Sequence, residues 1–180
     1  MDELELARHR FPDGAEVTGR VSSIPRPGVI GLFVDLPYGM VGFADVVNLP
    51  FSEAEWPPVG TITTFEVLQH RLGQVRLFPL DPRFRRSDAP PLGMSAAEWD
   101  AHKITYPVGS VVEGEVGVVY PANREYGVRY GDAWAWFGWS EEPPAVGEIA
   151  EYRVVRHLDT TRRTLLEPAR ETGGSAAPPS

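Results

Sequence analysis

The sequence predicts an all-β protein of two tandem five-stranded barrels, joined by a linker that holds a short helix. An internal repeat is the main reason, because residues 11–21 (FPDGAEVTGRV) recur as residues 106–116 (YPVGSVVEGEV) with the Pro, both Gly and the final Val in register. The repeat continues downstream, where VGTITTFEVLQHRLG begins at Val59 and VGEIAEYRVVRHLDT begins at Val146. Short alternating segments separated by Gly and Pro are typical of all-β folds.

The first copy carries the signals of five short strands, expected at residues 15–24, 29–36, 40–46, 62–70 and 74–78. Gly19 interrupts the first strand, which predicts a bulge or a sharp bend there. The segment Pro37-Tyr38-Gly39 predicts a tight turn between the second and third strands. After the third strand, Ser52 and Glu55 have the spacing of a capping box, so we expect a single helical turn there.

The second copy repeats this order after the linker. Ser95 and Glu98 have capping-box spacing, which predicts a short helix over residues 96–103. Five further strands are expected at residues 110–120, 125–130, 133–139, 148–157 and 162–167. The second copy has lost eight residues, and its connection SEEPPAV is too short for the helical turn expected in the first copy.

These observations divide the chain into a first barrel (residues 11–86), a linker with the helix (87–105), a second, more divergent barrel (106–170) and a disordered tail (171–180). Cys is absent, which excludes disulfides, a thiolate nucleophile and a Cys-based zinc site. The opening MDELELARHR is charged from its second residue, and no apolar run approaches the roughly 18 residues of a membrane span. We therefore expect a soluble, cytoplasmic protein without a metal or cofactor.

The first copy, with GAEVTGRV, GLFVDLPYGMVGF and VGTITTFEVLQHRLGQVRL, resembles the S-one domain of ribosomal proteins and ribonucleases. That family folds as a five-stranded OB-fold barrel and binds RNA on exposed aromatic residues, so the resemblance implies two tandem OB folds that bind single-stranded RNA. Phe33 matches the second aromatic position of the family's binding face. Ile30 and Asp45 stand at the positions of its first aromatic and its His. Arg71 and Gln74 stand at the positions of its acid and its Arg.

In the second copy, Tyr126 lies near the first aromatic position of the family and Arg162 near its basic position. Other aromatic and Arg residues on the second and third strands could add stacking and phosphate contacts, since stacking contributes roughly 1–3 kcal/mol per base. The candidate nucleic-acid-binding residues are therefore Arg20, Phe33, Tyr38, Phe43, Arg71, Tyr126, Arg129, Trp136 and Arg162.

The Trp-rich segment AWAWFGW leaves two interpretations. Alternation puts Trp134 and Trp136 on one face of the strand and the intervening alanines on the other. We favour an arrangement in which the Trp pair fills the barrel. The alternative is that Trp side chains lie at the surface, where they would suit a partner.

The four His residues do not indicate an active site. His70 and His157 fall at equivalent places in the two copies, which favours a structural role that both have inherited. The sequence has no HExxH motif, no Gly-rich phosphate loop and no nucleophile elbow, so we expect a protein that is not an enzyme. The basic cluster RFRR at residues 83–86 could clamp a phosphate backbone, but a solvated linker is the preferred interpretation.

Two functions from different classes follow. The first is weak, non-enzymatic binding of single-stranded RNA on the barrel face. The net charge of −8 counts against strong binding, because neutralisation of phosphates supplies most of the affinity for nucleic acid. The second is an acidic protein–protein interaction module, such as an inhibitor, immunity or assembly factor, that kept the barrel and lost RNA binding. An acidic surface would suit a basic partner.

Overall fold

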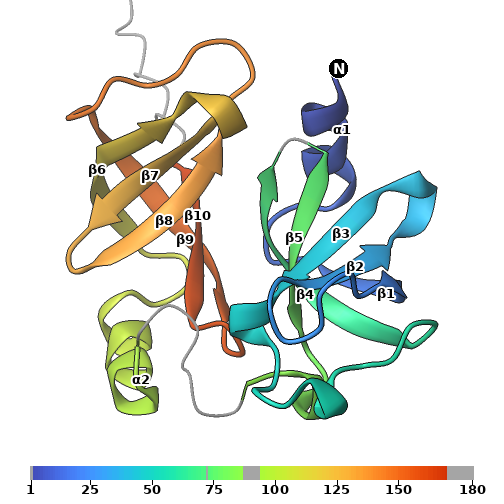
Figure 1. Ribbon diagram of the computed structural model, residues 1–180. Helices are drawn as coiled ribbons and strands as arrows, with labels where there is room; N and C mark the ends of the chain where they lie inside the picture. The colour runs from blue at the N-terminus through green and yellow to red at the C-terminus, as the bar shows by residue number, and fades with distance from the viewer. Residues whose placement is uncertain (1, 72, 87–93, 170–180) are drawn as a thin grey trace, which may run out of the picture.

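The computed structural model describes residues 2–71, 73–86 and 94–169 and shows an all-β fold with two barrel-like halves (Figure 1). The first half contains α1 (Glu3–Arg10), β1 (Glu16–Ser23), β2 (Gly31–Asp35), β3 (Val41–Asp45), β4 (Ile62–Arg71) and β5 (Gln74–Pro79). The second half contains α2 (Ala96–Thr105), β6 (Val111–Tyr120), β7 (Glu125–Tyr130), β8 (Ala133–Gly138), β9 (Ile149–Leu158) and β10 (Arg163–Pro168). Short 3-10 helices lie at Pro37–Gly39, Val46–Asn48, Glu53–Glu55, Pro82–Phe84 and Pro121–Asn123.

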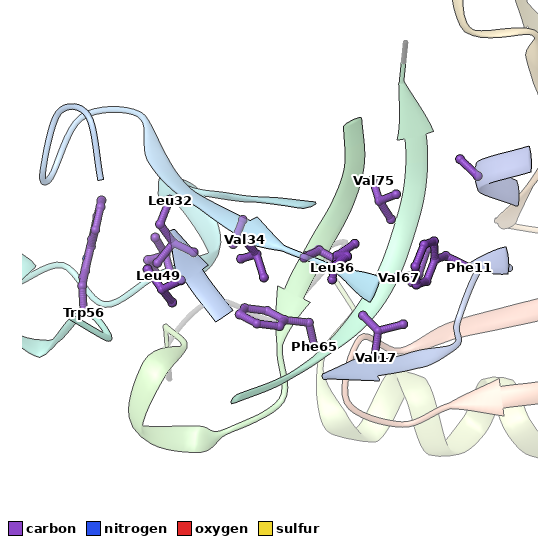
Figure 2. Close-up of a cluster of buried hydrophobic side chains, with 14 residues drawn as sticks. Phe11, Val17, Leu32, Val34, Leu36, Leu49, Trp56, Phe65, Val67 and Val75 are labelled. Atoms are coloured by element: carbon purple, nitrogen blue, oxygen red, sulfur yellow. The ribbon is translucent and has the colours of Figure 1, made fainter. Parts of the chain in front are cut away.

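The strands of the first half close into a barrel in the order β1-β2-β3-β5-β4. Neighbouring strands are antiparallel except β3 and β5, which run parallel and hold Phe43 opposite Arg76. Alternate residues of each strand point into the lumen, as expected for a half-buried sheet. The buried lumen side chains include Val17, Leu32, Val34, Phe65, Val67 and Val75 (Figure 2).

The connection between β3 and β4 covers one end of this barrel. It buries Leu49 and Trp56 beside Leu32 (Figure 2). The indole Nε1 of Trp56 donates a hydrogen bond to the carbonyl oxygen of Pro50 at 2.7 Å. The side chain of Ser52 makes no capping hydrogen bond, so the prediction of a capping box there is wrong. The segment is held by the packing of its apolar side chains.

The second half is a five-stranded sheet in the order β10-β9-β6-β7-β8, which curls without closing. Its edge strands, β8 and β10, are the counterparts of β3 and β5. Unlike β3 and β5, the strands β8 and β10 are not hydrogen-bonded to each other. The shorter connection after β8, residues 139–148, contains no buried residue, so nothing there matches the cover that Trp56 provides in the first barrel. The second barrel is therefore open along one seam.

The first strand of each half carries a bulge at the same place. In β1 the register with β2 shifts between Val21 and Ser23, and the equivalent shift occurs in β6. Of the two alternatives predicted for Gly19, a bulge or a sharp bend, the bulge is therefore wrong, since Gly19 pairs in regular register with Thr63. Gly19 permits close packing of β1 on β2, because a Cβ atom there would lie 2.3 Å from Cγ1 of Val34.

The paired His residues have the same structural role in both halves. Nε2 of His70 lies 2.8 Å from the carbonyl oxygen of Phe11, and Nε2 of His157 lies 2.9 Å from that of Tyr106. The backbone N–H groups of Phe11 and Tyr106 also cap the C-termini of α1 and α2. The repeated unit is therefore a helix followed by a barrel, which is longer than the sequence indicated.

Helix α1 connects the two halves. It begins with a capping box formed by Asp2 and Glu5. Nη2 of Arg8 donates hydrogen bonds to the carbonyl oxygens of Asn123 (2.7 Å) and Arg124 (2.8 Å) in the second half. Arg124 in turn pairs with the carboxylates of Asp2 (2.5 Å) and Glu5 (3.6 Å). Contacts with the second barrel therefore define the position of this helix.

The turn between β9 and β10 makes the second connection. Glu66 of β4 is buried and accepts hydrogen bonds at Oε1 from Thr161 Oγ1 (2.5 Å) and Arg163 Nη2 (2.6 Å). Arg163 also donates to the carbonyl oxygens of Val67 and Leu68, each at 2.8 Å. A buried ion pair with this many hydrogen bonds fixes the relative position of its two elements, since separating the charges would leave one uncompensated.

The linker helix agrees with its sequence signal. Ser95 and Glu98 form the expected capping box at the start of α2. Trp99 Nε1 donates to Asp159 Oδ1 at 2.8 Å, which attaches the helix to the turn between β9 and β10. Neither described helix is long and apolar enough to cross a membrane.

The RFRR cluster lies close to the first barrel. Arg83 pairs with Asp81 at 2.7 Å, and the guanidinium of Arg86 lies 3.4 Å from the centroid of the Phe51 ring. Residues 87–93, in the expected linker, and the tail expected to be disordered lie outside the described residues.

Candidate nucleic-acid interface

Phe33, Phe43 and Arg76 form a cluster on the outer face of the first barrel. The rings of Phe33 in β2 and Phe43 in β3 lie directly across from each other, with centroids 5.0 Å apart. The guanidinium of Arg76 in β5 lies 4.5 Å from the centroid of the Phe43 ring. Phe43 is buried, so a ligand would meet the half-buried Phe33 ring and the Arg76 guanidinium first.

The charges around this cluster are mixed. Nε of Arg76 is buried, and none of the described residues offers it a hydrogen-bond acceptor. Burial lowers the pKa of Arg76, the neighbouring Arg71 lowers it further, and Asp45, 3.9 Å from Nη1, opposes both effects. On the same outer face, Arg20 lies across from Asp35. The arginines beside the rings therefore have carboxylates close to them.

The outer face of the second barrel carries a larger set of rings, which we call the aromatic stack: Tyr120, Trp134 and Trp136. The Trp rings lie 6.2 Å apart at 18°, and Tyr120 stacks on Trp136 at 5.9 Å and 21°. The rings lie flat because Gly117 and Gly127 are beneath them, and a Cβ atom on Gly117 would be 2.5 Å from Trp134. Between 37% and 47% of each residue is exposed. The preferred interpretation that the Trp pair fills the barrel is therefore wrong, and alanines occupy the lumen side.

Strand register shows that one ring of each set is at an equivalent position, Phe43 in the first barrel and Trp136 in the second. Phe33 pairs with Phe43 directly after the β1 bulge, and Gly127 pairs with Trp136 at the same point of the second half. The resemblance placed Tyr126 near an aromatic binding position, but its ring packs against the core of the second barrel, where burial raises its pKa to about 12. The larger Trp ring on the third strand thus stands where the first barrel has Phe43.

A charged pair flanks the rings in both halves, with its signs exchanged. Arg20 faces Asp35 in the first barrel, and Glu115 faces Arg129 at the corresponding place in the second. Arg129 Nη2 lies 2.9 Å from Glu115 Oε2, and Arg129 lies across from Trp134. The predicted residue Arg129 is therefore beside the aromatic stack, but its charge is partly neutralised.

Three other predicted residues lie outside both clusters. Tyr38 is 72% exposed, and the guanidinium of Arg10 lies 4.2 Å from its ring centroid at the end of α1. Arg71 is exposed at the end of β4. Arg162 donates from Nη1 to the carbonyl oxygen of Met94 and faces the space between the barrels.

Sequence reasoning missed Arg76 and Tyr120. Arg76 is two residues from Gln74, so strand alternation places both on one face, but only the parallel pairing of β3 and β5 shows that this face adjoins Phe43. Tyr120 ends β6, and its contact with Trp136 depends on the curl of the sheet. Strand alternation could have pointed to Arg76 as a residue of this face, whereas no sequence signal could have pointed to Tyr120.

The His residues and carboxylates do not converge on a metal site in the part of the chain that the structure describes. His102 is buried, with Nε2 2.9 Å from Thr164 Oγ1. Burial lowers the pKa of His102, and the nearby His157 lowers it further. His102 therefore packs the buried face of α2 against β10 of the second barrel.

No protein-family model matches the chain, and no curated protein matches it. Among solved structures, it is similar to a multidomain protein with nucleic acid binding domains from Streptococcus pneumoniae TIGR4, with 12% identity and a TM-score of 0.31 over 87% of this chain and 52% of that one. It is also similar to GSP13 from Bacillus subtilis, with 17% identity and a TM-score of 0.35 over 55% of this chain and 78% of that one. The chain spans about half the length of the streptococcal protein.

Proposed function

We propose that the protein binds single-stranded RNA on the outer faces of its two barrels and has no enzymatic activity of its own. The observation that carries this proposal is that each half has aromatic rings with an arginine beside them on its outer face, with Phe43 and Trp136 at equivalent strand positions. Phe33 and Phe43 lie beside Arg76, and the aromatic stack lies beside Arg129. Nucleobases of any sequence stack on such rings, and arginine adds phosphate and cation–π contacts.

The mode of binding follows from the charge. The chain carries a net charge of −8, and several arginines of the two faces have carboxylates nearby. Because binding through phosphates requires positive charge, most of the affinity must come from stacking. We expect affinity in the micromolar range, with a shallow dependence on salt concentration.

Fluorescence anisotropy of a labelled oligouridine of roughly 12 nucleotides tests the proposal at low salt. Phe33→Ala and Trp136→Ala should each weaken binding by about fivefold or more, because each removes a ring worth about 1 kcal/mol or more of stacking. Ile104→Ala is the matched control, since Ile104 is 81% exposed on α2 and distant in sequence from both faces. That control should leave the affinity unchanged.

Absence of binding at tens of micromolar protein would contradict the proposal. Equal affinities of the Phe33→Ala variant and the Ile104→Ala control would contradict it for the first barrel. A parallel titration with oligothymidine separates a preference for RNA from general binding of single strands, because only RNA offers the 2′-hydroxyl.

A further inference from the structure

A cavity of about 910 Å³ lies between the free edges of the second barrel and opens toward the first. All six residues of β8 line it, together with residues 163–167 of β10. Arg8 of α1 and Asp13 and His70 of the first half form its other wall. Because consecutive residues of both strands face the cavity, the space follows the strands along the open seam.

The first barrel shows what fills such a seam. There β5 pairs in parallel with β3, placing Val75 beside Gly42 and Leu77 beside Ala44. Val34 pairs with Gly42 in the first half, and Val128 pairs with Ala135 in the second, so β8 is the register counterpart of β3. The seam of the second barrel is therefore a strand position, and its β10 does not occupy that position.

The reason that β10 remains apart is its attachment to the first barrel. Arg163, at the start of β10, is bonded to Glu66 and to two carbonyl oxygens of β4. The preceding Arg162 donates to the carbonyl oxygen of Met94. Closing the seam would require β10 to give up these buried contacts, so β8 keeps a free edge.

The β8 edge has none of the features that usually protect an exposed strand. Such edges commonly carry Lys, Pro or inward-pointing charges, which discourage pairing with another chain. The β8 sequence AWAWFG has none of these, whereas β10 carries Arg163, Glu167 and Pro168. Of the two edges, β8 is therefore the one suited to accept another strand.

The charge of the cavity decides which kind of polymer fits it. Its charged lining residues are balanced, with Arg8, Arg162 and Arg163 against Asp13, Asp132 and Glu167. The balanced charge gives a nucleic-acid strand no electrostatic attraction, and only a polypeptide can continue the main-chain hydrogen bonds of the free β8 edge. A neutral peptide strand needs only main-chain partners and apolar contacts on alternate residues. The lumen side of β8 offers such contacts at Ala133, Ala135 and Phe137.

We propose that the seam between β8 and β10 binds an extended, uncharged segment of a partner polypeptide, which pairs in parallel with β8. Its alternate apolar side chains enter the lumen beside Ala135, as Val75 and Leu77 of β5 do in the first barrel. This function does not depend on nucleic-acid binding, although Trp134 and Trp136 of the aromatic stack belong to β8 and also line the cavity.

The β5 sequence itself supplies a probe. A capped synthetic peptide of residues 73–80 with Arg76 replaced by Gln (GQVQLFPL), which carries no charge, is added to the full-length protein, and amide hydrogen exchange is followed by mass spectrometry. Amides of residues 133–138 should exchange about tenfold more slowly when the peptide is at about ten times its Kd. Amides of β3 should not change, because their seam is already filled by β5. A peptide with alternate N-methylated residues, which cannot pair, is the control.

Three results would overturn the proposal. The first is that the peptide does not protect residues 133–138 at concentrations up to about 1 mM, or that the N-methylated peptide protects them as strongly as the unmodified peptide does. The second is protection of β8 before any peptide is added, which would mean that a segment of this chain occupies the seam. If that protection increases with protein concentration, the occupant would be a second copy of the chain. The third is protection of β8 by oligouridine and not by the peptide. If the protein does not bind RNA, the anisotropy titration shows it, whereas the hydrogen-exchange experiment tests the peptide proposal. The failure of one proposal can therefore be distinguished from the failure of the other.

Discussion

A glycine in the second barrel takes the place of one of the two facing aromatic residues of the first. Where the first barrel has Phe33 across from Phe43, the second has Gly127 across from Trp136. The absent side chain on Gly127 lets the indole lie on the strand beneath it, with Cζ3 only 3.0 Å from the position of a Cβ atom. One exposed aromatic surface is thus built from two different combinations of residues.

Gly31 is the position where a side chain is least tolerable. Its φ is 136°, and a Cβ atom there would lie 2.2 Å from the carbonyl oxygen of Ala44, a backbone atom that cannot rotate away. We expect Gly31→Ala to lower the free energy of unfolding by about 3 kcal/mol or more. Gly39→Ala is the matched control, since Gly39 also has a positive φ but no atom within 4 Å. It should cost only about 1–2 kcal/mol in urea denaturation. Equal costs for the two variants would show that the contact with Ala44 does not matter.

At the scale of elements, the connection after the third strand distinguishes the two barrels. In the first half it brings Leu49 and Trp56 over the end of the lumen, and in the second half it is six residues shorter and buries no residue. The parallel pair of β3 and β5 closes the first barrel, while β8 and β10 stay apart. The loss of the cover and the open seam occur in the same barrel, which has the smaller buried clusters of the two.

The cover should contribute strongly to the stability of the first barrel. Trp56 is buried, so we expect Trp56→Ala to cost about 3–5 kcal/mol through lost contacts and the cavity left behind. Phe51→Ala, in the same connection, is the control, because Phe51 is 73% exposed and its main contact is the Arg86 guanidinium. It should cost no more than about 1 kcal/mol in the same urea titration. A Trp56→Ala variant as stable as the Phe51→Ala variant would mean that the connection does not seal the barrel.

At the scale of the whole molecule, the two halves are held by helix α1 and by the turn before β10. A charged group, Glu125, lies close to this junction and is buried. Burial raises the pKa of Glu125 to about 7, with the nearby Asp13 adding to the rise and Arg8, His70 and Arg71 opposing it. The contact between the halves therefore contains a carboxyl group that favours its protonated form.

The contribution of Glu125 to stability should fall as pH rises through this range. Below about pH 4.5, Glu125 is protonated in both the folded and the unfolded chain, so its burial does not lower the free energy of unfolding. Between about pH 4.5 and 7 the unfolded chain releases this proton first, which favours unfolding, and the cost is complete above about pH 7. We expect Glu125→Gln to raise the free energy of unfolding by roughly 2–3 kcal/mol at about pH 8 and to change it little at about pH 4. Urea denaturation of both proteins across this range measures the effect, and parallel pH profiles would contradict it.

The sequence by itself determined the features that depend on neighbouring residues. The repeat, the alternating runs and the turn residues located the ten strands of the described chain to within a few residues, and Ser95 with Glu98 located the start of α2. Alternation also separated Trp134 and Trp136 from the alanines between them. It could not say which of the two faces was the lumen, because that depends on how the whole sheet curls.

Only the tertiary structure decided which distant segments meet. The placement of Arg76 beside Phe43 requires a parallel pair between strands that are not consecutive, and the bond from Arg163 to Glu66 joins residues from different barrels. Neither partner carries a local signal of the other, because such contacts are selected by the packing of complete barrels. The open seam has the same origin: β10 has the sequence of a strand, but its anchorage on the first barrel keeps it from pairing with β8.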